Sequence, residues 1–229
     1  MEKLTRPVIA GNWKMHKTIS EARQLAAEIV SQAPALTMAS IILIPPFTAI
    51  QEVKKTVGDS GILVGGQNLF WEEEGAFTGE ISAHQLKEAG CDFVIIGHSE
   101  RRQYFGETDE TVSQKVLAAR RHGLIPIVCV GENLEERKSG KTLKKIKVQL
   151  ENSLFSLAEE EFKMVILAYE PIWAIGTGQN ATPEQAEEVH GYIRQLIADR
   201  YSQDLSSCAI ILYGGSVKPA NSFSLIKEK

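Results

Sequence analysis

The chain has 229 residues, of which 43% are hydrophobic, which is enough to bury a large core in one α/β domain. Its formal net charge of −4 does not favour a nucleic-acid or membrane-surface partner. The first residues, Met1–Pro7, lack the apolar core of a secretion signal, and no apolar run approaches the length of a membrane span. We therefore expect a single domain over residues 1–229, located in the cytoplasm, with no nucleic-acid and no membrane partner.

Seven short apolar runs predict β-strands along the chain. They are Val8–Gly11, Ile41–Pro45, Ile62–Gly66, Phe93–Gly97, Ile125–Val130, Val165–Tyr169 and Ala209–Tyr213. The runs recur at the spacing of βα units, and nearly all of their residues are apolar. We therefore expect both faces of each strand to be buried, as in a parallel sheet flanked by helices.

Helical patterns lie between the predicted strands. One places apolar residues at Ala22, Leu25, Ala26, Ile29 and Val30, and another places them at Ala186, Val189, Ile193, Leu196 and Ile197. The sequence Thr182–Gln185 predicts a capping box at the start of the second helix, with proline at its first position. The alternation predicts a (β/α)8 barrel one strand short, or an open doubly wound sheet. No G-x-G-x-x-G follows the first strand, which disfavours a dinucleotide-binding sheet.

The three cysteines of the chain lie in or beside apolar runs, at Cys91, Cys129 and Cys208. This odd number predicts buried, reduced thiols in place of disulfides. No metal-ligand spacing appears, so we expect no metal site.

Polar residues follow several strands, at the strand ends where a barrel places its chemistry. They are Asn12, Lys14, His98, Ser99, Glu170, Gly214, Gly215 and Ser216. Glu170 follows apolar neighbours and is predicted to accept a proton, while Ser99 is predicted to be the N-cap of a helix. Taken one at a time, each of these residues has a structural explanation: a structural histidine, a solvated lysine or a Gly-Gly turn. Taken together, the residues supply a base, an electrophile, a cation and an anion site at the same end of the predicted barrel.

Bulky and small residues alternate directly after Glu170. Pro171, Ile172 and Trp173 are followed by Ala174, Ile175, Gly176, Thr177 and Gly178. This composition predicts a lid, which is a rigid flap between two hinge points whose backbone dihedral angles can change. The alternative is an ordinary strand-to-helix turn with a solvated Glu170.

Six segments resemble those of the triosephosphate isomerases, in the same order. They are Gly11–Lys14, Gly65–Asn68, Gly75–Glu80, Ile96–Arg102, Tyr169–Gly178 and Tyr213–Val217. The resemblance runs from Arg6 to about Leu225 and implies a TIM barrel. It further implies interconversion of dihydroxyacetone phosphate and glyceraldehyde 3-phosphate by proton transfer through an enediolate, with no metal and no organic cofactor.

The resemblance also implies a role for each matching residue. Glu170 moves the proton between carbons, a neutral His98 polarises the carbonyl, and Glu100 lies near these groups. Lys14 and Asn12 bind the substrate and stabilise the enediolate, and the lid excludes water. The residues implied to hold the phosphate are Gly176, Gly214, Gly215 and Ser216.

A homodimer is implied as well. The segment from Gln67 to Glu80 resembles a loop that inserts into the partner subunit, where Thr78 reaches the neighbour's Asn12 and Glu100. The alternative is a solvated charge run, Glu72–Glu74, in a long loop. The interface is favoured because aromatic residues of this segment would be costly to expose in a monomer.

The family continues after the seventh strand with an eighth strand and a second Gly-Gly turn. The 229-residue sequence stops at Lys229, so we expect a barrel without its last βα unit, with lower stability and weaker phosphate binding. The short end suggests one alternative function, a truncated, weakly active or inactive phosphate-binding remnant of the family. A separate alternative is a Schiff-base aldolase that uses Lys14, which is disfavoured because Lys14 lies in a Trp-Lys turn beside Asn12.

Overall fold

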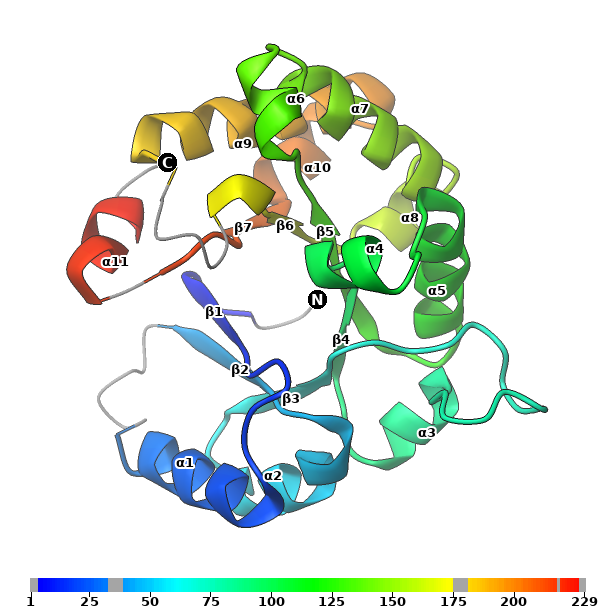
Figure 1. Ribbon diagram of the computed structural model, residues 1–229, viewed down its shortest axis with the longest axis vertical. Helices are drawn as coiled ribbons and strands as arrows, with labels where there is room; N and C mark the ends of the chain where they lie inside the picture. The colour runs from blue at the N-terminus through cyan, green and yellow to red at the C-terminus, as the bar shows by residue number, and fades with distance from the viewer. Residues whose placement is uncertain (1–3, 33–38, 175–180, 218, 227–229) are drawn as a thin grey trace. The chain divides into compact units, whose positions relative to one another are not determined.

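The computed structural model describes residues 4–32, 39–174, 181–217 and 219–226. It contains two compact units. The first unit consists of Met1–Ile96 and Gln114–Pro126, and the second of Gly97–Ser113 and Ile127–Lys229. Two elements pass from one unit to the other, α5 (Asp109–Arg121) and β5 (Ile125–Val130). Figure 1 labels the α-helices and the strands.

The first unit is built from βα repeats around a parallel sheet. Its strands, in spatial and in chain order, are β1 (Val8–Asn12), β2 (Ser40–Ile44), β3 (Leu63–Gly66) and β4 (Phe93–Ile96). Its helices are α1 (Ile19–Gln32), the 3-10 turn η2 (Phe47–Ala49), α2 (Ile50–Val57) and α3 (Ala83–Glu88). Helix α1 packs against α2 (Figure 1), and α2 also packs against β3.

The second unit repeats the same construction. Its strands β5, β6 (Ile166–Tyr169) and β7 (Ile210–Tyr213) are parallel and pair in chain order. The shorter helical elements are α4 (Ser99–Tyr104), α6 (Leu134–Lys138), α8 (Glu159–Phe162), η3 (Ile172–Ala174), α10 (Gln203–Cys208) and α11 (Pro219–Ile226). The longer helices are α7 (Thr142–Ser153) and α9 (Pro183–Arg200), and α9 packs against both α7 and α10.

The predicted strands agree with the structure, and each observed end lies within one residue of its predicted position. Every residue of β4 and β6 is buried, as expected for strands covered on both faces. The same expectation is wrong for β1 and β7, whose residues are partly exposed and include Ile9 at 46%. Within the described residues, β1 pairs with β2 and β7 pairs with β6, so the other side of each strand is less covered.

The capping box predicted at the start of α9 is confirmed. Thr182 Oγ1 accepts a hydrogen bond from the Gln185 N–H at 3.2 Å, and Gln185 Oε1 accepts one from the Thr182 N–H at 3.0 Å. Pro183 occupies the first position of the helix. The five apolar residues predicted to face the core from this helix are all buried. In α1 only part of the predicted stripe is buried, at Ala22 and Ala26.

The prediction of buried cysteines holds for Cys91 and Cys129 and is wrong for Cys208, which is exposed. Cys208 is the last residue of α10, and β7 begins only at Ile210, so the thiol lies outside the strand that was predicted to bury it. None of the helices in the described part of the chain has both the length and the apolar character that a membrane crossing requires. Among the same residues, no three His, Cys, Asp or Glu side chains gather where they could hold a metal ion.

Candidate active site

His98 follows β4 and begins α4. The N-cap of this helix is His98 and not Ser99 as predicted, because the imidazole Nδ1 accepts the Glu100 N–H at 3.2 Å. A ring nitrogen that accepts from a backbone N–H has no proton of its own, so these contacts assign a neutral imidazole protonated at Nε2. The Glu100 carboxylate lies farther from Nδ1, at 3.6 Å, and does not change this assignment. His98 therefore presents an N–H donor on the side away from its own helix.

Glu170 is a buried carboxylate directly after β6, and His98 Nε2 lies 3.3 Å from its Oε1. The backbone N–H of Ser99 donates to Glu170 Oε2 at 3.0 Å. Burying a charge without partners would be costly, and these two donors supply the compensation. The predicted base and the predicted electrophile are thus in direct contact within the second unit. Burial, followed by the nearby Glu170 carboxylate, raises the pKa of the Cys129 thiol well above its ordinary value.

Two glycines make room for Glu170. A Cβ atom on Gly131 would lie 1.8 Å from the Glu170 carbonyl oxygen, which is far too close for two atoms that are not bonded to each other. A Cβ atom on Gly214 would lie 2.7 Å from Glu170 Cγ. Glycine is therefore required at position 131, directly after β5, and is favoured at position 214, directly after β7.

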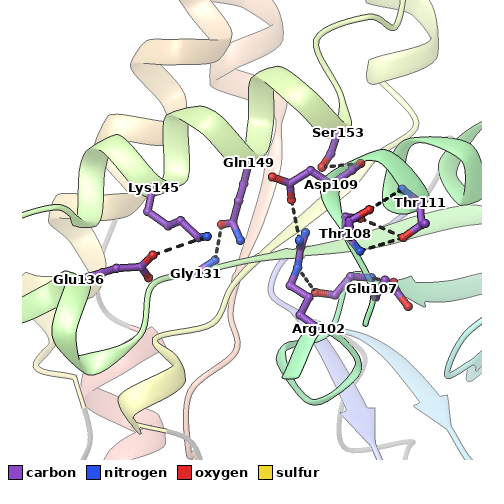
Figure 2. A network of polar contacts seen from close by, with 11 residues as sticks. Arg102, Glu107, Thr108, Asp109, Thr111, Gly131, Glu136, Lys145, Gln149 and Ser153 are labelled. Carbon is purple, nitrogen blue, oxygen red and sulfur yellow. Dashed lines mark hydrogen bonds and ion pairs between the residues drawn. The ribbon is translucent and has the colours of Figure 1, made fainter. Parts of the chain in front are cut away.

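A polar network that includes Arg102, Glu107 and Asp109, labelled in Figure 2, holds the backbone just before His98. Gly97, which precedes His98, donates its N–H to Glu107 Oε1 at 2.7 Å and accepts from Arg102 Nε at 2.9 Å. Arg102 also pairs with Asp109 at 2.6 Å. Charged side chains thus bond to both the N–H and the carbonyl of Gly97. Because Gly97 directly precedes His98, the position of His98 depends on these contacts.

The same network continues beside Glu170. Gln149 on α7 accepts the Gly131 N–H at 2.9 Å, and Figure 2 shows this side chain pointing from the helix to the strand end. Lys145, one turn earlier on α7, lies 3.6 Å from Glu136. The Gln149 side chain of α7 thus helps to fix the Gly131 backbone, against which the Glu170 carbonyl packs.

Glu132 is a functional candidate that the sequence reasoning missed. This fully buried carboxyl accepts hydrogen bonds at Oε1 from Trp173 Nε1 at 2.9 Å and from the Tyr169 hydroxyl at 3.1 Å. Its own carbonyl accepts the Ile172 N–H at 3.0 Å. Burial raises the pKa of Glu132 above 4.5. A signal was available, because Glu132 follows the end of β5 much as Glu170 follows the end of β6.

The first part of the predicted lid is therefore attached to Glu132. Pro171 and Ala174 are buried, and Ile172–Ala174 form the 3-10 turn η3. The remaining predicted lid residues, Ile175, Gly176, Thr177 and Gly178, lie outside the described residues.

The predicted phosphate segment after β7 makes several contacts inside the second unit. The Gly214 N–H donates to the Tyr169 carbonyl at 2.7 Å, which extends the pairing of β6 with β7. The Ser216 hydroxyl donates to the Ala174 carbonyl at 3.0 Å, so it touches the end of η3. Gly215 lies between these two residues.

Asn12 and Lys14 lie in the first unit, at and just after the end of β1. The Asn12 side chain accepts the Lys14 N–H at its Oδ1 at 2.9 Å, which leaves the Asn12 amide group with its N–H donors. Lys14 has a φ of 53°, in the left-handed region that is unfavourable for a residue with a side chain. A non-glycine residue in this conformation at a strand end is a frequent mark of a functional site.

The predicted dimer loop also belongs to the first unit. Gln67 follows β3, and its side-chain amide donates to the carbonyls of Lys14 at 2.8 Å and of Ile44 at 3.1 Å. Thr78 is exposed in a turn. The base of the loop is closed by a hydrogen bond from the Phe70 N–H to the Ile81 carbonyl at 2.8 Å.

A carboxylate in contact with a neutral imidazole, both at the ends of parallel strands, is the arrangement expected of an α/β enzyme that works by acid–base chemistry. The comparison with known families makes the class specific. The chain belongs to the triosephosphate isomerase family, because the family model described as triosephosphate isomerase matches residues 7–229. Its fold class is accordingly the α/β TIM barrel.

Curated relatives agree with the family model. The triosephosphate isomerase of Caldanaerobacter subterraneus subsp. tengcongensis is 52% identical over 225 residues, which cover 98% of this chain and 90% of that protein. The triosephosphate isomerase of Alkaliphilus metalliredigens is 50% identical, with 99% of this chain and 91% of that protein covered. That of Geobacter metallireducens is 48% identical, with coverages of 97% and 88%.

Proposed function

We propose that the chain is an intramolecular aldose–ketose isomerase that interconverts dihydroxyacetone phosphate and D-glyceraldehyde 3-phosphate, as in glycolysis and gluconeogenesis. The contact that supports this proposal best is the one between Glu170 Oε1 and His98 Nε2. It brings together a base and a neutral N–H donor, the two groups that are needed to move a proton between adjacent carbons.

In the proposed reaction, Glu170 removes a proton from the carbon next to the substrate carbonyl, and His98 donates its Nε2 proton toward the carbonyl oxygen. The product of this step is an enediolate. Glu170 then returns the proton to the neighbouring carbon, while His98 exchanges protons with the two oxygens. The Ser99 and His98 donors now occupied by Glu170 must first be exchanged for the substrate.

Lys14 and Asn12 stabilise the negative charge that develops on the enediolate oxygens. The Lys14 ammonium is a cation, and the Asn12 amide group keeps N–H donors because its Oδ1 is used by the Lys14 N–H. Glu100 contributes its backbone N–H, which sets the tautomer of His98. The lid, Pro171 to Gly178, closes over the intermediate, and Gly176, Gly214, Gly215 and Ser216 bind the phosphate. No metal and no organic cofactor takes part in this scheme.

Glu170→Gln tests the proposal. The amide cannot accept the proton, so kcat should fall by about three orders of magnitude or more while KM changes little. The assay is the coupled conversion of each triose phosphate, and deuterium taken up from D2O into the product reports proton transfer. Glu88→Gln on the exposed end of α3 is the matched control. A Glu170→Gln rate above about a tenth of that of the parent would contradict the proposal.

The alternatives predict different results in the same experiment. A non-catalytic remnant would bind a phosphate-bearing inhibitor without converting either triose phosphate. An aldolase that uses Lys14 would be trapped by borohydride in the presence of substrate. Uptake of deuterium from solvent that requires Glu170 is expected from the isomerase.

We also propose that the protein is a cytoplasmic homodimer in which the loop from Gln67 to Glu80 contacts the partner. The rings of Phe70, Trp71 and Phe77 pack on one another, with centroid separations of 4.0 and 4.6 Å, yet Phe77 remains 42% exposed. Such an aromatic cluster on a projecting loop is typical of an interface. Sedimentation equilibrium should give twice the chain mass, and Phe77→Glu should shift the protein toward the monomer.

A further inference from the structure

Lys14 has a backbone conformation that is unfavourable for a residue with a side chain. Its φ of 53° places a lysine where mainly glycine, asparagine and aspartate are found. Such a conformation persists only when the surrounding contacts determine it. The groups that hold the Lys14 peptide units therefore decide where its side chain points.

Both backbone polar groups of Lys14 are held by side chains. Its N–H donates to Asn12 Oδ1 at 2.9 Å, and its carbonyl accepts from Gln67 Nε2 at 2.8 Å. Asn12 is only two residues away, so its contact is local. Gln67 follows β3, and it is separated from Lys14 by 53 positions in the sequence. The Gln67 contact thus ties the turn after β1 to a different strand of the sheet.

The Gln67 amide is itself well fixed. The same Nε2 donates to the Ile44 carbonyl at the end of β2 at 3.1 Å, and this carbonyl also accepts the Trp13 N–H at 3.0 Å. The next residue, Asn68, is buried and accepts a hydrogen bond from the buried Lys115 Nζ at 2.7 Å. Gln67 therefore joins the ends of β1, β2 and β3 at one point.

From these contacts we infer that Gln67 is a positioning residue for the reaction, which acts by holding Lys14 in the left-handed conformation that directs its ammonium. The inference rests on the proposed function, since it needs Lys14 to act on the substrate. It gives Gln67 a role inside its own chain, in addition to the expected place of this residue at the start of the dimer loop.

Gln67→Met tests the inference, because methionine nearly matches the size of glutamine but donates no hydrogen bond. A displacement of about 1 Å in a catalytic group can reduce the rate about a hundredfold, so kcat/KM should fall between about ten- and a hundredfold. Gln24→Met is the matched control, since Gln24 is an exposed glutamine of α1 in the same unit. The control should retain the parent kcat/KM.

A double-mutant cycle shows whether Gln67 acts through Lys14. Lys14→Met should itself impair binding and turnover. If Gln67 works by positioning the ammonium, adding Gln67→Met to Lys14→Met should lower kcat/KM by less than about threefold. Full multiplication of the two single effects would overturn the inference. A Gln67→Met variant with unchanged kcat/KM, beside an impaired Lys14→Met variant, would overturn it and leave the proposed function intact. An unimpaired Lys14→Met variant would overturn both.

Gln67→Glu provides a second readout, which also serves if Gln67→Met does not fold. The introduced carboxyl group can donate to the Lys14 carbonyl only while it is protonated, and its ionised form would face two carbonyl oxygens. Its kcat/KM, relative to the parent, should therefore fall as the pH rises between 5 and 8. A pH profile parallel to that of the parent would contradict the positioning role.

Discussion

The substitution Gly214→Ala should misplace the proposed base without removing it. The added Cβ would lie 2.7 Å from Glu170 Cγ, whereas carbon atoms in contact are separated by about 3.5–4.0 Å. The Glu170 side chain must therefore move by roughly 1 Å. Gly214 does not have a positive φ, so alanine brings no backbone strain of its own. A shift of about this size in a reacting group costs about a hundredfold in rate.

We expect kcat of the Gly214→Ala variant to fall by about a hundredfold, with KM changed by less than about threefold. Overpacking should also lower the free energy of unfolding by about 1–3 kcal/mol, which a denaturant titration measures. The matched control is Gly191→Ala, because Gly191 lies in α9 and a Cβ there would meet no atom within 4 Å. A folded Gly214→Ala variant with kcat within about threefold of the parent would refute the steric reasoning. A raised KM with normal kcat would instead assign the effect to phosphate binding.

The remaining predictions concern pH, thiol chemistry and domain organisation. Burial lowers the pKa of His190 from 6.5 to about 4, so the unfolded chain binds a proton that the folded chain does not, and stability should fall as the pH drops from about 6.5 to 4. His190→Gln should flatten this part of the pH dependence in thermal melting, and an unchanged slope would contradict the assignment. Cys208 is exposed, while burial raises the pKa of Cys91 to about 12, so one thiol per chain should react quickly with a thiol reagent and the two buried ones only after unfolding. If residues 1–229 form the single domain that we propose, calorimetry should show one cooperative transition, and two separate transitions would refute it.

The strands could be predicted because their amino-acid composition is compatible with few other secondary structures. A parallel strand that is buried on both faces is a continuous run of apolar, often β-branched residues, and β4 and β6 have this pattern. The start of α9 was predictable for a similar reason, since Thr182, Pro183 and Gln185 specify a cap among themselves. Both signals are local, so no knowledge of the rest of the fold was needed.

Long-range contacts were not predictable in the same way. The sequence shows that Glu170 and His98 follow strands, but their mutual contact and the hydrogen bond from the Ser99 N–H depend on how β5, β6 and α4 pack. The contact of Gln67 with Lys14 is of this kind as well. Burial of β1 and β7 was overestimated because apolar composition does not reveal how many neighbours a strand has.

The cap of α9 has a consequence for how the protein can be engineered. The helix start is specified by Thr182 to Gln185, whereas η3 is attached to the buried Glu132 through Trp173. The two elements are thus held by separate sets of side chains, so one attachment can be weakened or strengthened by substitution without changing the other. The turn and the helix can therefore be redesigned one at a time.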